Sequence, residues 1–81
     1  MRLDKYLKVS RLIKRRTVAN EACENGKISL NGRVAKPSAD VKEGNIIELT
    51  LGDKVIKVRV VKITEHVMKS DAVDMYEVIS Q

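Results

Sequence analysis

The sequence is poor in the residues that most often carry catalysis or mark an extracellular protein. Its 81 residues include no Trp or Phe, two Tyr, one Cys, one Pro and one His. A single Cys cannot form an internal disulfide, so we expect a cytoplasmic protein in a reducing compartment. No run of 18 apolar residues is present, and charges interrupt the apolar positions of the N-terminus. We therefore expect neither a membrane-spanning helix nor a secretory signal.

The few residues capable of chemistry are not grouped as an active site would require. His66 has no Cys or carboxylate at metal-ligand spacing. Cys23 lies on the apolar side of a predicted helix, where a buried and inert thiol is the ordinary interpretation. The acidic residues Asp71, Asp74 and Glu77 are interpreted as a solvated rim. We expect no enzyme activity, no catalytic residue, no metal site and no cofactor.

Positive charge, in contrast, is abundant and unevenly distributed. Residues 1–36 hold ten Lys or Arg against three acids, whereas residues 37–81 hold six against eight. The net charge of +5 therefore combines a basic N-terminal part with a slightly acidic C-terminal part. This asymmetry indicates a face built to meet a polyanion. The alternative is a basic surface that serves solubility alone.

The hydrophobic pattern predicts two short helices in the first third of the chain. Leu3, Tyr6 and Leu7 share one side of a helix over residues 3–9. A second helix, over residues 16–25, ends at Gly26 because glycine readily adopts a positive φ. Its expected buried stripe consists of Val18, Ala19, Ala22 and Cys23.

From residue 27 the hydrophobic period changes to two, which is typical of β-strands. Asn31-Gly32 is a strong hairpin-turn signal between two short strands. Residues 46–51 and 54–63 form a second predicted hairpin, residues 64–72 a loop and residues 75–80 a final strand. The sequence thus predicts one α+β domain over residues 1–81, with two N-terminal helices packed on a small, mostly antiparallel sheet.

Cations crowd the start of the second predicted helix. Lys14, Arg15 and Arg16 stand at its N-terminal end, whereas Glu21 and Glu24 lie toward its C-terminal end. Both groups oppose the helix dipole, at a cost of about a few tenths of a kcal/mol each. A bound anion would reverse the sign, because backbone N–H groups and guanidinium groups would act on it together. Phosphate suits the two-pronged geometry of arginine well.

The shortage of aromatic residues narrows the choice of polyanion. Proteins that bind single strands stack bases on several exposed rings, whereas Tyr6 fits the buried side of the first helix. A folded nucleic acid that is recognised through its backbone and shape is therefore favoured. Composition and spacing leave structured RNA and duplex DNA both open.

Four motifs occur in a familiar order: RLDK at residues 2–5, KRRT at 14–17, NG at 31–32 and AKPS at 35–38. With them the chain resembles the S-four-type RNA-binding domain, or alpha-L fold, over about residues 2–51. Strands over about residues 54–80 would close the domain. Within this family it is most similar to the heat-shock-protein-fifteen branch, in the short form that acts in ribosome-associated quality control.

The resemblance implies a binding factor that contacts large-subunit rRNA and peptidyl-tRNA on obstructed large ribosomal subunits. It also implies that the factor assists a partner tailing factor, which extends the C-terminus of the stuck chain. We expect a monomer when free, and no membrane partner. The alternative is the RNA-targeting domain of a larger rRNA-modifying enzyme, against which the lack of a catalytic remnant argues.

The charge pattern and the resemblance together name the expected RNA contacts: Arg2, Lys5, Lys8, Arg11, Lys14, Arg15, Arg16 and Lys36. Asp4, within RLDK, is expected to hold a neighbouring arginine in place rather than touch RNA. Asn31 and Gly32 are expected to support the RNA face through their turn. The position that caps the second helix, commonly Ser or Thr in this fold, is Arg15 here, so capping is weaker and the charge higher.

Overall fold

The protein is an antiparallel sheet with two helices on one face. The computed structural model describes residues 1–65 and 72–80. The elements follow in the order α1 (Leu3–Val9), α2 (Arg16–Glu24), β1 (Ile28–Leu30), β2 (Arg33–Val34), β3 (Ile46–Leu51), β4 (Lys54–Val60), the 3-10 turn η1 (Ala72–Asp74) and β5 (Tyr76–Ser80). The strands form one sheet in the order β2-β1-β3-β4-β5, and each neighbouring pair is antiparallel. The predicted α+β class is confirmed.

Both helices lie where the hydrophobic spacing predicts them. The three apolar residues of α1 are fully buried. Gly26 terminates α2: it follows the C-cap residue Asn25 and its φ is +73°. The amides of Gly26 and Lys27 donate to the carbonyls of Cys23 and Ala22, at 3.1 and 2.9 Å, in the hydrogen-bond pattern of a Schellman motif. This pattern satisfies carbonyl groups that the helix end would otherwise leave without a partner.

One residue of the predicted buried stripe of α2 is exposed. Ala19, Ala22 and Cys23 are buried, but 46% of Val18 is open to solvent. The three buried residues have i, i+3, i+4 spacing and form a narrow stripe of small side chains. Val18 lies about 100° around the helix from Ala19, at the edge of that stripe. The prediction that Val18 is buried is wrong for this reason.

The turn at Asn31-Gly32 joins β1 to β2 and also holds β3. Both residues have positive φ, +52° and +85°, as a two-residue hairpin of this kind requires. The Asn31 N–H donates to the Ile46 carbonyl at 2.7 Å, and the Ile46 N–H donates to Asn31 Oδ1 at 2.8 Å. Asn31 therefore fixes the start of β3 beside β1.

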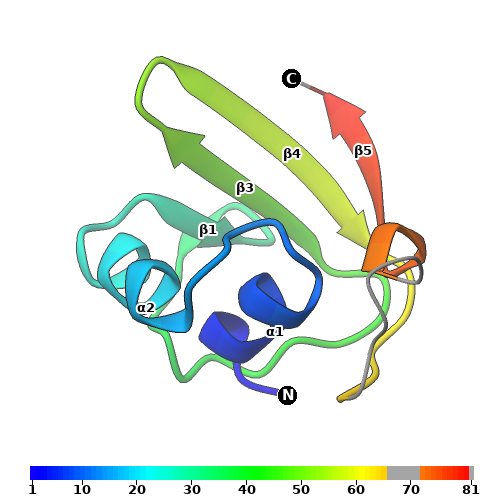
Figure 1. Ribbon diagram of the computed structural model, residues 1–81. Coiled ribbons are helices and arrows are strands. Elements are labelled where there is room, and N and C mark those ends of the chain that lie inside the picture. The colour runs from blue at the N-terminus through cyan, green and yellow to red at the C-terminus, as the bar shows by residue number, and fades with distance from the viewer. Residues whose placement is uncertain (66–71, 81) are drawn as a thin grey trace.

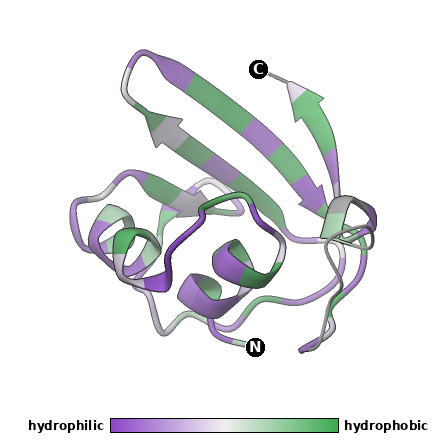
Figure 2. Ribbon diagram, in the orientation of Figure 1, coloured by the Kyte–Doolittle hydropathy of each residue, from purple (hydrophilic) through white to green (hydrophobic). Residues whose placement is uncertain are grey.

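The core lies between the helices and one face of the sheet. Figure 1 shows α1 and α2 against the same face, and Figure 2 shows hydrophobic and hydrophilic residues alternating along β3 and β4. Tyr6 is fully buried, and its hydroxyl donates to the Met75 carbonyl at 2.7 Å. The interpretation of Tyr6 as a core residue is confirmed. The opposite face carries cross-strand ion pairs, Lys57–Glu48 at 3.8 Å and Arg59–Glu77 at 3.6 Å.

The helices cover only part of the sheet face that carries the core. In Figure 1 the β3–β4 hairpin and β5 extend well beyond them. Leu51 alternates along β3 with the buried residues Ile47 and Leu49, but it is 36% exposed because it lies at the far end of the strand. Val78 in β5 is likewise 45% exposed. The sheet therefore presents apolar side chains that no helix covers.

Some expectations lie partly or wholly outside the described residues. These are the loop over residues 64–72 and the interpretations of His66 and Asp71, since residues 66–71 are not described. Across residues 1–65 and 72–80, no group of three or more His, Cys, Asp or Glu is placed to hold a metal ion. No helix in those two ranges is both long enough and apolar enough to cross a membrane.

Candidate nucleic-acid interface

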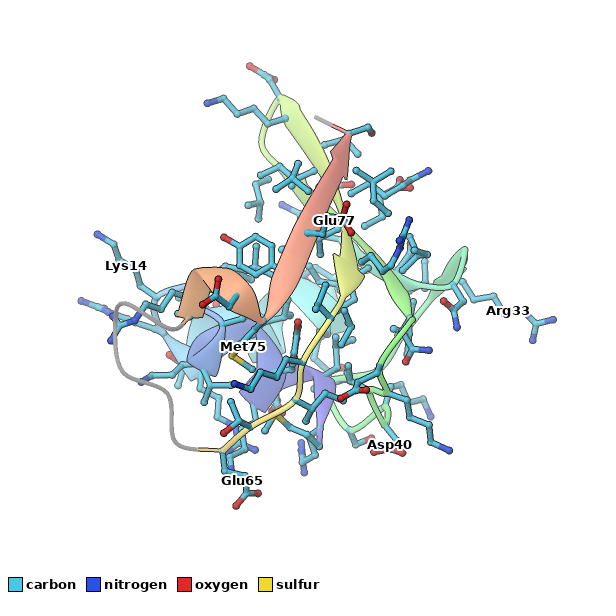
Figure 3. All side chains as sticks on the ribbon, turned by 90° about the vertical axis from the view of Figure 1, so that its right-hand side faces the viewer. Lys14, Arg33, Asp40, Glu65, Met75 and Glu77 are labelled. Carbon is cyan, nitrogen blue, oxygen red and sulfur yellow. The ribbon has the colours of Figure 1, made fainter. Side chains whose placement is uncertain are left out.

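The connector between α1 and α2, residues 10–15, is anchored by buried residues and exposes cations to solvent. Ser10 and Ile13 are buried, and the Ile13 N–H donates to the Leu7 carbonyl at 3.0 Å. Arg11, Lys14 and Arg15 lie between or beside these anchors, and all three are exposed. Figure 3 shows Lys14 extending away from the body of the molecule. The connector therefore presents cations from a fixed backbone.

Arg11 occupies a backbone conformation that its side chain does not favour. Its φ is +63°, in the left-handed region that glycine enters most easily. The residue stands just after the end of α1, and its N–H donates to the Lys8 carbonyl at 3.0 Å. Many helices place glycine at this position. An arginine here costs backbone strain and supplies a positive charge.

Asp4 joins the two helices through a buried carboxylate. Its side chain is 3% exposed and accepts hydrogen bonds from Arg2 Nε at 3.2 Å, Arg2 Nη2 at 3.3 Å and Arg16 Nη2 at 3.4 Å. Asn20 Nδ2 donates to the same carboxylate at 3.3 Å. The side chains of Arg2 and Arg16 remain 51% and 47% exposed. Asp4 thus binds two arginines and leaves about half of each side chain open to solvent.

The ionised form of Asp4 is favoured by these partners. Burial raises the pKa of the carboxyl, but hydrogen bonds from Arg2, Asn20 and Arg16 outweigh that effect and lower the pKa below its ordinary value. A single carboxylate therefore serves two guanidinium groups. Arg2, Arg16 and Asp4 together therefore retain a net positive charge.

The N-cap residue of each helix is an arginine whose side chain makes no capping hydrogen bond. Arg2 precedes α1 and Arg15 precedes α2, both with extended backbone and without a capping hydrogen bond. The first turn of α2 holds no acid and its last turn no base. The expected conflict between the side-chain charges and the dipole of α2 is therefore present, and Asp4 offsets it at Arg16.

Lys36 lies close to the start of α1 through backbone contacts. The Leu3 N–H donates to the Ala39 carbonyl at 2.8 Å, and the Asp4 N–H donates to the Pro37 carbonyl at 3.1 Å. Lys36 directly precedes Pro37 and is exposed. The loop after β2 thus brings this cation beside RLDK, about thirty residues earlier in the chain.

Lys5, like Arg2 and Arg16, has an acid partner, but that partner is an exposed glutamate rather than Asp4. Its Nζ lies 3.1 Å from Glu65 Oε1, and the side chain is 34% exposed. Among residues 1–65 and 72–80, no ion pair is recorded for Lys8, Arg11, Lys14, Arg15 or Lys36. The eight cations on α1, the connector, the start of α2 and the loop after β2 are called the cationic site below: Arg2, Lys5, Lys8, Arg11, Lys14, Arg15, Arg16 and Lys36.

Sequence reasoning missed Asn20 as a member of this arrangement. The side-chain amide of Asn20 donates a hydrogen bond to the Asp4 carboxylate. Asn20 also lines a hollow of about 380 Å³ together with Asp4, Arg16 and Thr17. The signal was its i, i+4 spacing from Arg16, which places both residues on one side of α2. Nothing in the sequence showed that this side faces Asp4.

The one thiol of the protein lies in an environment that disfavours its reactive form. Cys23 is buried and free. Burial raises its pKa to about 11, and the nearby charges of Asp4 and Glu24 act in the same direction. A thiolate, the reactive form, is therefore disfavoured. The interpretation of Cys23 as a buried core residue is confirmed.

The fold and the cationic site define a class: a small α+β domain whose basic face is suited to a polyanion. Residues 1–47 match the model of the S4 domain family. The solved structure of heat shock protein 15 from Vibrio cholerae superposes with a TM-score of 0.91 at 33% identity, covering 99% of this chain and 82% of that one. The predicted S-four-type fold is confirmed.

Two curated relatives match nearly end to end. The chain is 51% identical over 81 residues to the "RQC P-site tRNA stabilizing factor" of Streptococcus pneumoniae, covering all of this chain and 92% of that protein. It is 53% identical over 78 residues to the protein of the same name from Halalkalibacterium halodurans, covering 96% of this chain and 89% of that one. The chain belongs to the S4 domain family, and its resemblance to the quality-control branch is confirmed.

Proposed function

We propose that this protein stabilises P-site tRNA during ribosome-associated quality control, by binding structured RNA through the cationic site. The RNA would be peptidyl-tRNA together with large-subunit rRNA on an obstructed large ribosomal subunit. Relatives matched over about nine-tenths of their length carry this role in their names. The proposed location is the cytoplasm, where such subunits occur.

The observation that carries the proposal is the arrangement around Asp4 and the connector. Five exposed cations have no acid partner among the described residues, and two arginines share a single buried carboxylate. Basic side chains that the protein's own acids neutralise so little are suited to bind successive phosphates of an RNA backbone. Arg2 and Arg16 are already oriented by Asp4, so less side-chain entropy is lost when they bind.

Each predicted residue has a role in this proposal. Arg2, Arg16 and the connector cations would contact phosphates directly, and Lys8 and Lys36 would extend the contact on either side. Lys5 would contribute once phosphate competes with Glu65. Asp4 supports the arginines, and Asn31 with Gly32 supports the loop that carries Lys36.

The protein would act as a binding factor, with one domain over residues 1–81 and no catalytic step of its own. Its further partner would be the tailing factor that extends the obstructed chain. The alternative role, as the targeting domain of an rRNA-modifying enzyme, has no observation in its favour, because the matched relatives are named as tRNA stabilising factors.

The proposal is tested with large subunits that carry a labelled peptidyl-tRNA. We expect the wild-type protein to slow release of the tRNA from these subunits, and Arg2→Gln/Arg16→Gln to lose most of that effect. Arg33→Gln/Lys42→Gln removes the same charge from exposed positions outside the cationic site and serves as the control. Equal release with and without the wild-type protein would contradict the proposed function.

A further inference from the structure

A groove of about 650 Å³ lies beside the cationic site, between the connector, the hairpin end of β4 and the first half of β5. Apolar side chains line most of it: Leu12, Ile56, Tyr76 and Val78. Asp53 and Lys54 stand at its hairpin end. The groove lies where the sheet extends beyond the helices, so it opens on the face that carries the core.

The groove exposes side chains of a kind that proteins usually bury. Val78 is 45% exposed, and Leu12, Ile56 and Tyr76 are half-buried. A concave apolar surface with a few polar groups at its edge is typical of a binding site. Of the two tyrosines, Tyr6 is fully buried and Tyr76 is partly open to solvent.

Leu12 connects the groove to the cationic site. It follows Arg11 directly, and Lys14 comes two residues later, so the connector contributes its apolar side chain to the groove and its cations to solvent. Lys54 adds a further cation at the opposite end, against the single acid Asp53. An occupant that combines an apolar, flat part with negative charge would match both features.

We propose that the groove accepts one unstacked base of an RNA whose phosphates lie on the connector. This inference rests on the proposed function and adds a second element of recognition to it. A base can stack on the Tyr76 ring and contact Leu12 and Val78, while its phosphate stays within reach of Arg11 and Lys14. An acidic peptide would match the same charges, but RNA occupies the groove and the cationic site as a single ligand.

The test compares three RNA hairpins at low salt: one with a single unpaired nucleotide, one abasic at that position and one fully paired. Stacking of a base on an aromatic side chain contributes about 1–3 kcal/mol, which corresponds to roughly 5- to 150-fold in affinity. We expect the wild-type protein to prefer the unpaired nucleotide over the abasic site by a factor in this range.

Two substitutions locate the preference in the groove. Tyr76→Leu removes the ring, and Val78→Asp places a negative charge at an exposed position of the lining. Both substitutions should abolish the preference for the unpaired nucleotide. Tyr76→Leu should also leave the affinity for the abasic hairpin unchanged. Val61→Asp changes an equally exposed valine outside the groove, and it should retain the preference. Thermal melts establish whether each variant is folded. If Tyr76→Leu does not fold, Val78→Asp alone tests the inference.

The outcomes separate the groove from the proposed function. Salt-dependent binding of all three hairpins without a preference overturns the inference and leaves the proposed function intact. Failure of the folded protein to bind any hairpin contradicts the proposed function itself. A photo-crosslinker placed at Val78 should capture RNA on large subunits. Capture of an acidic protein segment there, in place of RNA, would overturn the inference.

Discussion

At the scale of single residues, the cationic site depends on a few side chains that serve binding at some cost to stability. Asp4 is buried and ionised, which is favourable because the side chains of Arg2, Asn20 and Arg16 and the backbone N–H of the next residue donate to its carboxylate. Arg11 adopts a positive φ that favours glycine. Functional sites often retain such local strain.

Replacing Asp4 with asparagine should lower the free energy of unfolding by about 1–3 kcal/mol at neutral pH, because three donating side chains lose a charged acceptor. The pKa of Asp4 is lowered on folding, so its ionised form stabilises the protein above the unfolded pKa. That contribution is lost as the pH falls through the folded pKa. The wild type and Asp4→Asn should therefore converge in stability below about pH 4.

Urea unfolding at several pH values measures this difference. Glu43→Gln alters an exposed acid with no recorded ion pair among the described residues, and it should change stability little at any pH. A constant gap between the wild type and Asp4→Asn down to pH 2 would show that the carboxylate charge is not what stabilises the site.

Arg11→Gly and Arg11→Ala should lose the same RNA affinity and differ in stability. Both remove one charge, but only glycine relieves the positive φ, so the glycine variant should be more stable than the alanine variant by about 1 kcal/mol. Thermal unfolding and filter binding, performed on both variants, check the two parts. An alanine variant that is as stable as the glycine variant would exclude strain at this position.

At the scale of elements, the sequence predicted most of what the structure contains. The spacing of Leu3, Tyr6 and Leu7 fixed the limits of α1, and Gly26 marked the end of α2. Asn31-Gly32 marked the first hairpin, because few other residue pairs tolerate its dihedral angles. Such signals are local, and sequence records them well.

The features that the sequence did not predict are exposures and contacts that depend on how the helices and strands pack together. Val18 is exposed because the stripe that α2 buries is narrow, and Leu51 because the helices end short of its position. Asn20 binds Asp4, sixteen residues earlier in the chain. The groove needs Leu12 and Tyr76 to meet across the fold. These facts follow from tertiary contacts rather than from local pattern.

The missing cap of α2 gives a prediction at this scale. Arg15→Ser introduces a side chain that can accept a hydrogen bond from the first turn, and should stabilise the protein by about 1 kcal/mol. It should also weaken RNA binding, because one phosphate contact is lost. Arg15→Lys retains the charge without a cap, and should preserve binding without the gain in stability. Thermal melts and RNA titrations check both variants; tighter RNA binding by Arg15→Ser would exclude a phosphate contact at this residue.

At the scale of the whole molecule, the protein separates a basic helical side from the rest of its surface. In Figure 3, Lys14 and Arg33 extend from opposite sides of the molecule. The opposite face of the sheet pairs its charges across strands, whereas the connector leaves its cations without acid partners among the described residues. If charge drives binding, then where a cation lies should matter more than how many there are.

The most direct measurement is the salt dependence of tRNA affinity for two variants of equal net charge. Arg11→Gln/Lys14→Gln/Arg15→Gln removes three cations of the connector, whereas Arg33→Gln/Lys42→Gln/Lys62→Gln removes three exposed cations elsewhere. We expect the connector variant to reduce the slope of log affinity against log salt by about 2 to 3, at roughly 0.7–0.9 per lost phosphate contact, and the control variant to leave the slope near that of the wild type. Equal slopes for the two variants would contradict the cationic site as the surface that binds RNA.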